Sequence, residues 1–364
     1  MWITCASGEN MYLKNIKVKN FRNYENLNIN LEKNINIFYG DNAQGKTNIL
    51  ESIFLTAFGK SFRTSKEKEM IKKGEKFAKV EIAYQKKDRE GKININISDK
   101  KIISVNGIKI KKLSELLGNI NIVIFTPDDI SILKDGPNVR RRFLDMMIGQ
   151  LRTNYVYNLN MYLKTLEQRN NYLKQQANND AMFDIWDEKL ADYGEKVFKY
   201  REEFIEKIKS KINTIHNEIT NEQIRIEYKS DCSDKEKFKE KLLKNRNLDK
   251  FKGYTSSGVH RDDFKVFINE EEVNIYGSQG QNRTAILSLK LAELQVIYED
   301  IGEYPILLLD DFMSELDEKR ISKFLQNIKD IQVIITCTRN INIKNSVSFN
   351  VVKGTVKTRD INNI

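Results

Sequence analysis

Residues 40–47 have the residue types and spacing of a loop that binds phosphate groups. Their sequence, Gly-Asp-Asn-Ala-Gln-Gly-Lys-Thr, matches the pattern Gly-x-x-x-x-Gly-Lys-Thr. Glycine lets the backbone close on a phosphate, and the N–H groups at a helix start favour an anion. Lys46 would reach the β- and γ-phosphates, and Thr47 would offer its hydroxyl to Mg²⁺. We predict that the loop binds ATP through Gly40, Asp41, Asn42, Ala43, Gln44, Gly45, Lys46 and Thr47.

The loop needs a strand before it and a helix after it. Residues 34–39, Asn-Ile-Asn-Ile-Phe-Tyr, read as a strand, and residues 48–55 read as the start of a helix. The alternative, a Gly/Lys turn without a ligand, does not explain why strand, loop and helix follow in this order.

A second candidate element is the apolar segment 306–309, which ends in two carboxylates. A buried strand with an acid at its carboxyl end is the pattern that holds Mg²⁺ beside a phosphate-binding loop. We expect Asp310 to bind the metal together with Thr47. Asp311 is placed to orient or polarise the attacking water and is our candidate catalytic residue beside Lys46, although it could instead be a supporting or capping carboxylate.

The segment Gly-Ser-Gln-Gly-Gln at 277–281 precedes a predicted helix over 282–298. Small residues before a helix form an N-terminus that binds anions. The segment lies after a helical insertion and shortly before the Asp310 strand, an order that resembles the ATP-binding cassette superfamily and its signature motif. This resemblance implies that Ser278, Gly280 and Gln281 meet the ATP of a second copy. Residues 314–317, Ser-Glu-Leu-Asp, resemble the D-loop of that superfamily.

The pattern of hydrophobic residues divides the chain into three sections. Residues 11–125 alternate in the manner of strands, for example at 92–97, with an Asn-Gly hairpin signal at 106–107. Residues 126–254 carry apolar side chains at spacings of three and four, which predicts two long antiparallel amphipathic helices. We expect residues 11–125 and 255–364 to form an ATPase lobe and residues 126–254 a helical lobe, with 276–298 packing near the latter. Residues 1–10 look like a leader or extension.

Composition limits the possible partners. The 364 residues include 61 Lys and Arg against 51 Asp and Glu, a net charge of +10. This surplus fits a polyanion such as nucleic acid, or simple solubility. Three widely spaced cysteines suggest neither disulfides nor a zinc site, and no apolar run reaches the roughly 20 residues that span a bilayer. We therefore expect a cytoplasmic protein without a membrane partner.

Several segments together resemble the bacterial RecF family of DNA repair proteins, which are SMC-like ATPases without the long coiled coil. The resemblance covers residues 11 to about 358. The segments that carry it are 21–24, 40–47, 59–64, 140–145, 257–264, 278–281 and 308–311.

The resemblance implies an α/β fold: an ABC-type P-loop ATPase head, with mixed sheets around the P-loop helix and an α-helical second lobe. It also implies an ATP-dependent homodimer that binds DNA at gaps and junctions. Such a dimer would act with RecO and RecR to load recombinase in recombinational repair and at replication forks. Arg22 and Asn23 would lie near the nucleotide, and Arg63 near phosphate or DNA.

The sequence departs from the cassettes of transporters at three places. Residues 127–129, Pro-Asp-Asp, replace the Q-loop glutamine; Asp311 replaces a glutamate; and Thr336 or Thr338 replaces the switch histidine. These changes favour slow hydrolysis that serves as a switch.

Two charged clusters have structural alternatives. Arg140, Arg141 and Arg142 could bind phosphates or pair with acids, and Arg63, Arg140 and Arg141 are our candidate DNA contacts. His260, within His-Arg-Asp-Asp at 260–263, is expected to belong to a structural network rather than to an acid–base set.

Two other functions compete with a DNA-dependent ATPase. The cytosolic ATPase subunit of an ABC transporter would need the Q-loop glutamine and the switch histidine. A small-molecule P-loop kinase would leave the segments at 277–281 and 314–317 unexplained.

Overall fold

The computed structural model describes residues 10–87, 89–175, 180–311 and 331–359. The chain divides into two compact units: unit 1 comprises residues 1–129 and 293–364, and unit 2 comprises residues 130–292. No helix in these described ranges is long and apolar enough to cross a bilayer.

The division differs from the boundaries that we expected. Unit 2 begins at residue 130 rather than 126, and residues 255–292 belong to unit 2 rather than to the ATPase lobe. The physical reason is strand pairing, because β10 (Asp263–Ile268) pairs along its whole length with β9 (Ile224–Lys229). Helix α8 (Gln279–Ile301) crosses the division, with residues up to Ala292 in unit 2 and the rest in unit 1.

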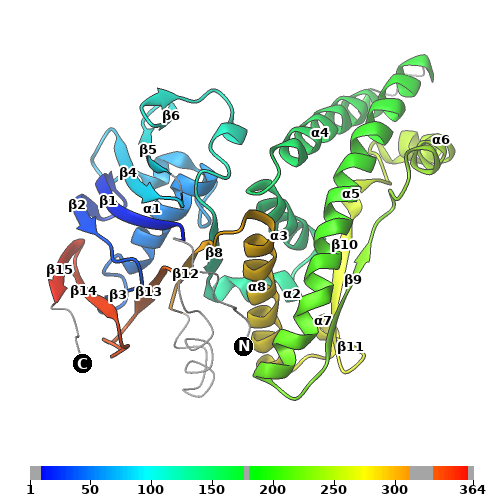
Figure 1. Ribbon diagram of the computed structural model, residues 1–364. Coiled ribbons are helices and arrows are strands. Elements are labelled where there is room, and N and C mark those ends of the chain that lie inside the picture. The colour runs from blue at the N-terminus through cyan, green and yellow to red at the C-terminus, as the bar shows by residue number, and fades with distance from the viewer. Residues whose placement is uncertain (1–9, 88, 176–179, 312–330, 360–364) are drawn as a thin grey trace. The chain divides into compact units, whose positions relative to one another are not determined.

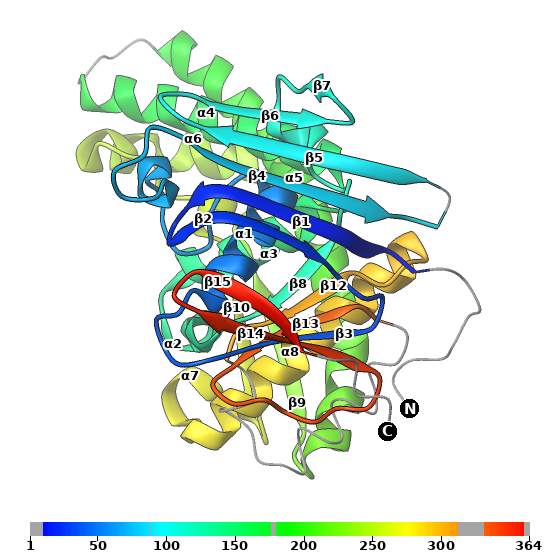
Figure 2. The same cartoon turned by 90° about the vertical axis from the view of Figure 1, so that its left-hand side faces the viewer.

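One sheet of unit 1 is antiparallel, with the strand order β2-β1-β4-β5-β6-β7 (Figure 2). Its strands alternate between buried apolar and exposed polar residues, as the sequence predicted. The expected Asn106-Gly107 turn joins β6 to β7, with positive φ at both residues. The bounds are β1 Tyr12–Phe21, β2 Tyr24–Asn30, β4 Ala78–Gln85, β5 Glu90–Ile97, β6 Lys101–Val105 and β7 Ile108–Lys109.

The other sheet of unit 1 has the order β15-β14-β3-β13-β12-β8 and is parallel except for β15. The strand before the P-loop is β3, and the strand before Asp310 is β12. These two strands are not adjacent, because β13 lies between them. The bounds are β3 Ile35–Tyr39, β8 Ile122–Phe125, β12 Ile306–Leu309, β13 Val333–Cys337, β14 Ser346–Val352 and β15 Thr355–Arg359.

Helix α1 (Lys46–Phe58) lies between the two sheets and contacts β1, β4, β5 and β13 (Figures 1 and 2). Its apolar side chains are buried on all sides, as a helix between two layers requires. The helix ends at Gly59, which adopts the left-handed conformation with φ +64°. The position of α1 therefore holds the P-loop at the carboxyl ends of the parallel strands.

Unit 2 is mostly helical, and its two longest helices are α4 (Thr153–Lys174) and α5 (Asp180–Ile219). They are antiparallel as predicted, because Tyr155 bonds to Arg201 whereas Arg169 bonds to Asp187. The remaining helices and strands are α2 Ser131–Lys134, α3 Pro137–Gly149, α6 Lys235–Lys252, α7 Val273–Tyr276 and β11 Glu271–Glu272, which pairs with β10. Across both units, short 3₁₀ turns cover Glu67–Met70, Leu113–Glu115, Pro127–Ile130 and Val259–Arg261.

Candidate nucleotide site

The P-loop has the backbone that a phosphate cradle requires. Gly40 and Gly45 have φ values of +154° and +113°, which side chains disfavour. A Cβ on Gly45 would lie 2.5 Å from the amide nitrogen of Asn23, and one on Gly40 would lie 2.3 Å from the carbonyl oxygen of Val351. No larger residue fits at either position without moving these neighbours.

Lys46 is buried and folds back over the loop. Its Nζ donates to the carbonyl oxygens of Gly40 at 2.6 Å and Asp41 at 3.0 Å. These bonds hold one positive charge over the backbone N–H groups of the loop, so lysine and loop together favour an anion.

Two hydroxyl groups converge on the carboxylate of Asp310. Thr47 Oγ1 and Thr336 Oγ1 both donate to Oδ1 of Asp310, at 2.9 and 2.7 Å. Burial raises the pKa of Asp310 above its usual value; the two hydrogen bonds oppose this rise, and the charge of the neighbouring Asp311 adds to it. A threonine hydroxyl and a carboxylate are the oxygen ligands that Mg²⁺ prefers, so this donor set fits the metal.

Asp311 follows Asp310 in the left-handed region, with φ +50°. Its backbone N–H donates to Thr336 Oγ1 at 3.0 Å, so one hydroxyl group contacts both aspartates. Strained backbone of this kind is common at active sites. Of the two threonines considered for the switch position, Thr336 near the end of β13 contacts the site, whereas Thr338 is exposed to solvent.

Asn23 rests against the P-loop. Its side-chain amide donates to the carbonyl oxygen of Gln44 at 2.7 Å and accepts from Asn48 at 2.8 Å. The backbone N–H groups of Lys353 and Gly354 also bond to Gln44, so the turn between β14 and β15 supports the loop from another side.

Arg22 lies in the turn between β1 and β2, with φ +53°, and its guanidinium is paired within the protein. Nε and Nη2 donate to the two carboxylate oxygens of Glu51 at 2.8 and 2.6 Å, and Nη1 donates to the carbonyl oxygen of Glu69. The guanidinium of Arg22 therefore contacts Glu51 of α1 and the backbone at Glu69, and it supports α1 through Glu51.

Arg63 reaches the same cluster and remains 44% exposed. Its Nη1 donates to Asn48 Oδ1 at 2.7 Å and lies 3.5 Å from Glu51. The positive charge of Arg63 also lowers the pKa of Asp310. Contact of Arg63 with phosphate or DNA stays a prediction.

Glu51 is the residue that sequence reasoning missed. Its side chain is completely buried, and its carboxylate accepts from Arg22, Arg63 and the hydroxyl of Ser61. The sequence does place a glutamate within an apolar helix, one turn after Asn48. Because a buried carboxylate must be paired, this position could have predicted an ion pair there. Tyr24, whose hydroxyl donates to the carbonyl oxygen of Gly45, gave no such signal.

The predicted signature residues belong to unit 2, whereas the P-loop belongs to unit 1. Ser278 begins α8 with a capping box: its Oγ accepts from the N–H of Gln281, whose side-chain oxygen accepts from the N–H of Ser278. Gln281 also donates to Glu222. Ser278 and Gly280 are exposed, so this helix end can meet an anion. The segment 314–317 lies outside the described residues.

Arg140 does not fit the expected contact with DNA. It is buried and donates twice to Asp263, at 2.5 and 3.0 Å, and also to the carbonyl oxygens of Ile132 and Asp135. The alternative of pairing with an acid is therefore the one observed. Arg141 is partly buried and donates to the carbonyl oxygen of Asp262 and to Asn138, which also ties it to unit 2.

His260 belongs to a structural network, as expected. Its Nε2 lies 3.0 Å from the carbonyl oxygen of Thr255 and its Nδ1 lies 2.8 Å from the hydroxyl of Tyr162. Asp262 is buried and accepts from Arg201, Tyr228 and Ser230. These contacts join the loop before β10 to α4, α5 and β9.

The fold and the site together define an ATPase head of the ATP-binding cassette class, with a parallel sheet, a P-loop helix and a helical insertion. The family described as "RecF/RecN/SMC N terminal domain" matches residues 12–361. The DNA replication and repair protein RecF of Clostridium perfringens is 44% identical over 95% of this chain and 100% of its own length. RecF of Clostridium tetani is 47% identical over 92% of this chain and 95% of its own.

Solved structures agree with this assignment. The structure described as the recombination mediator protein RecF-ATP in the RecFOR pathway is 39% identical, with a TM-score of 0.93 over 98% of this chain and all of that one. An Smc head bound to the C-winged helix domain of ScpA is 17% identical with a TM-score of 0.59, which shows a shared fold. The chain belongs to the RecF family.

Proposed function

We propose that this protein is an ATP-dependent, DNA-binding dimer of recombinational repair and replication-fork maintenance. The observation that carries the proposal is the convergence of Thr47, Asp310, Asp311 and Thr336 beside the P-loop. The exposed helix end at Ser278 supports a dimer, since it can complete the phosphate contacts of a second copy. Hydrolysis then separates the two copies.

The side chains at the site favour slow turnover. The shorter Asp311 takes the place of the glutamate found in transporter cassettes, and its strained backbone holds it beside Thr336. Both histidines of the sequence, His216 and His260, belong to unit 2, so no imidazole of the same unit can act as a general base at the P-loop. ATP therefore serves as a switch more than as a source of rapid work.

Magnesium is the metal that the site fits, with the hydroxyl of Thr47 and the carboxylate of Asp310 as ligands. A bound magnesium ion neutralises charge on the phosphates. Burial and the neighbouring carboxylate of Asp311 raise the pKa of Asp310, so a cation bound there would offset negative charge that is costly to bury.

DNA and two proteins are the partners that we infer. The relatives are DNA replication and repair proteins, and the structural relatives are recombination mediators of the RecFOR pathway. We infer that this chain likewise binds DNA in the cytoplasm, at gaps and junctions, and acts with RecR and RecO to load recombinase. Its net charge of +10 supports a polyanionic partner.

The test is the size of the protein in solution with and without ATP and Mg²⁺. We expect wild type to be monomeric without nucleotide and to dimerise with ATP. Asp311→Asn should accumulate as a stable dimer because it binds ATP and hydrolyses it poorly. Lys46→Ala, the control, should stay monomeric because it lacks the phosphate contact. A monomer under all conditions for wild type and Asp311→Asn would overturn the proposed mechanism.

The transporter subunit is the weaker candidate. Residues 127–130 form a 3₁₀ turn without glutamine, and Thr336 stands in the switch position. Copurification of an integral membrane protein with the full-length chain would favour the transporter over the proposed function.

A further inference from the structure

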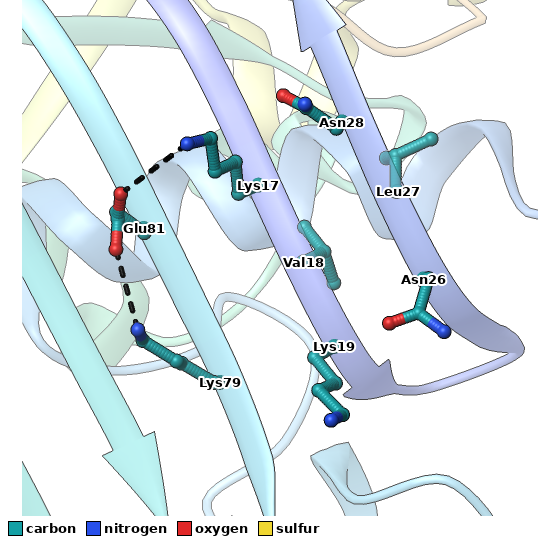
Figure 3. Close-up of a pocket in the computed structure, with 8 residues that line it drawn as sticks. All are labelled: Lys17, Val18, Lys19, Asn26, Leu27, Asn28, Lys79 and Glu81. Carbon is teal, nitrogen blue, oxygen red and sulfur yellow. Dashed lines mark ion pairs between the residues drawn. The ribbon is translucent and has the colours of Figure 1, made fainter.

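The outward face of the antiparallel sheet in unit 1 is polar and has no role in the site described above. The inward side chains, such as Ile16, Val80 and Ile95, are buried, and α1 contacts this sheet on that side. The outward side chains are mainly lysine and asparagine, and Figure 3 shows Lys17, Lys19, Lys79, Asn26 and Asn28 among them. We call these outward residues of β1, β2, β4 and β5 the lysine face.

Strand register arranges the lysine face in rows that cross the sheet. Residues that face each other on neighbouring strands belong to one row, and the rows repeat every second residue, about 6.8 Å along the strand. One row is Asn26, Lys19, Lys79 and Asn96; the next is Asn28, Lys17, Glu81 and Asn94. A third row places Lys92 beside Ala83. The lysines therefore lie in neighbouring rows on one face of the sheet, and we call them the lysine array.

The charges of this array are unbalanced. Lys19 and Lys79 lie directly opposite each other on β1 and β4, a like-charge pair that destabilises a sheet. Glu81 lies 3.3 Å from Lys79 and 4.0 Å from Lys17, so one carboxylate serves two lysines (Figure 3). Lys17 and Lys79 keep 53% and 43% of their side chains exposed. The repulsion between Lys19 and Lys79 does not stabilise the fold, whereas an anion bound from outside would give both lysines a counterion.

The shape of the face suits an extended ligand. A shallow depression of about 510 Å³ is lined by Lys17, Lys19 and Lys79, and another of about 540 Å³ by Lys92 and by Lys14, which pairs with Glu90. Glu81 lines both, so they form one continuous surface across the strands. The exposed ring of Phe77 lies beside this surface, 5.8 Å from the ammonium of Lys19.

We propose that the lysine face binds the sugar–phosphate backbone of DNA; the proposal rests on the DNA-binding function proposed above. Lysine ammonium groups bind phosphates as point charges, and asparagine amides donate to phosphate oxygens. Repeated cations on a flat face match a polymer with regularly spaced charges rather than a single small anion. Such contacts position the duplex without reading its sequence. Glu81 weakens the attraction and keeps binding reversible.

The test measures the binding of a labelled gapped duplex and of its single strand by fluorescence anisotropy at several salt concentrations. The variant K17A/K19A/K79A should bind about tenfold or more weakly, and its plot of log affinity against log salt should be shallower by about two to three, since three phosphate contacts are lost. The matched control, K196A/K199A/K209A on α5, removes the same charge from exposed lysines and should bind as wild type does.

A second variant gives a change of opposite sign. Glu81→Gln removes the negative charge between Lys17 and Lys79 and should strengthen DNA binding by roughly twofold or more. A variant that was merely misfolded could not gain affinity. ATP affinity should be the same in all of these variants, because none of the changed residues touches the P-loop.

The outcomes separate the inference from the function on which it rests. If wild type does not bind DNA, the proposed function fails. If both triple variants bind DNA as tightly as wild type does, the lysine face does not contact DNA, but the proposed DNA-binding function stands. If K17A/K19A/K79A keeps its DNA affinity but loses binding to an acidic peptide or to vesicles of anionic lipid, the ligand of the lysine face is not DNA. That result would overturn the inference.

Discussion

Glu51 holds together the residues around the P-loop. It is fully buried, yet it accepts from two guanidinium groups and one hydroxyl. The same arginines were expected near nucleotide and phosphate, so Glu51 sets the position of both. A buried carboxylate is tolerated only with such partners, and the partners in turn become dependent on it.

We expect Glu51→Gln to lower the free energy of unfolding by about 3 kcal/mol, because the change leaves Arg22 without its counterion. Arg22→Gln should cost a similar amount, since it leaves the buried Glu51 with weaker partners. The double variant should be more stable than the sum of the two losses predicts. Urea unfolding of the four proteins measures this coupling, and purely additive losses would contradict it.

Thr336 is a second residue with a separable role. We expect Thr336→Val to slow single-turnover ATP hydrolysis by about tenfold and to change ATP affinity little, because the lost hydroxyl contacts both Asp310 and Asp311 but not the P-loop. The matched control is Thr338→Val at an exposed position, which should hydrolyse ATP as wild type does. Equal slowing in both variants would remove the assigned role.

At the scale of elements, the paired helices α4 and α5 are held by buried ions as well as by apolar contacts. Arg169 on α4 binds Asp187 on α5 and Asp249 on α6. Arg201 on α5 binds Asp145 on α3 and Asp262 before β10. Both networks tie the long helices to the segment after residue 230, which explains why residues 255–292 belong to unit 2.

The two histidines of unit 2 make its stability depend on pH. Burial lowers the pKa of His260 to about 4 and also lowers the pKa of His216. A carbonyl accepts from Nε2 of His260, so Nδ1 accepts from Tyr162 in the neutral ring. In the unfolded chain both histidines take up a proton near pH 6.5. Their contribution to the free energy of unfolding is therefore fully present above that pH and is lost as the pH drops toward 4.

We expect the loss due to His260 to be on the order of 2 kcal/mol at pH 4.5, less than the full shift implies because the ring is partly exposed. Denaturant unfolding between pH 7 and 4.5 measures it. His260→Asn should be less stable at pH 7 but should lose less on acidification. An equal pH dependence in both proteins would contradict the assignment.

For the molecule as a whole, net charge bears on the DNA binding that we propose. The net charge is +10, and no base-reading motif was found in the sequence, so phosphate contacts should dominate. We expect DNA affinity to fall by about a thousandfold between roughly 50 and 200 mM salt, with little dependence on sequence. Anisotropy titrations with two unrelated duplexes check this. An affinity that barely changes with salt concentration would contradict DNA binding through phosphate contacts.

Much of the site could be predicted before the fold was seen. The glycines and Lys46 of the P-loop, the apolar strand before Asp310, the antiparallel helices and the network around His260 all depend on local spacing and residue type. Local patterns failed where contacts join distant segments. Arg140 looked available for DNA because its partner Asp263 is far along the chain, and residues 255–292 were assigned to the wrong unit because the pairing of β9 with β10 is equally distant.

Residue types and their spacing were enough to predict the chemistry of the phosphate loop, because glycine, lysine and threonine act there through the backbone that they form. The fold was needed to show that Thr336 on β13 contacts both aspartates, that Glu51 pairs with Arg22 and Arg63, and that lysines of β1, β4 and β5 share one face. Hydrogen bonds, ion pairs and strand register act over a few ångströms in space, whereas many of these partners are tens to hundreds of residues apart in the chain.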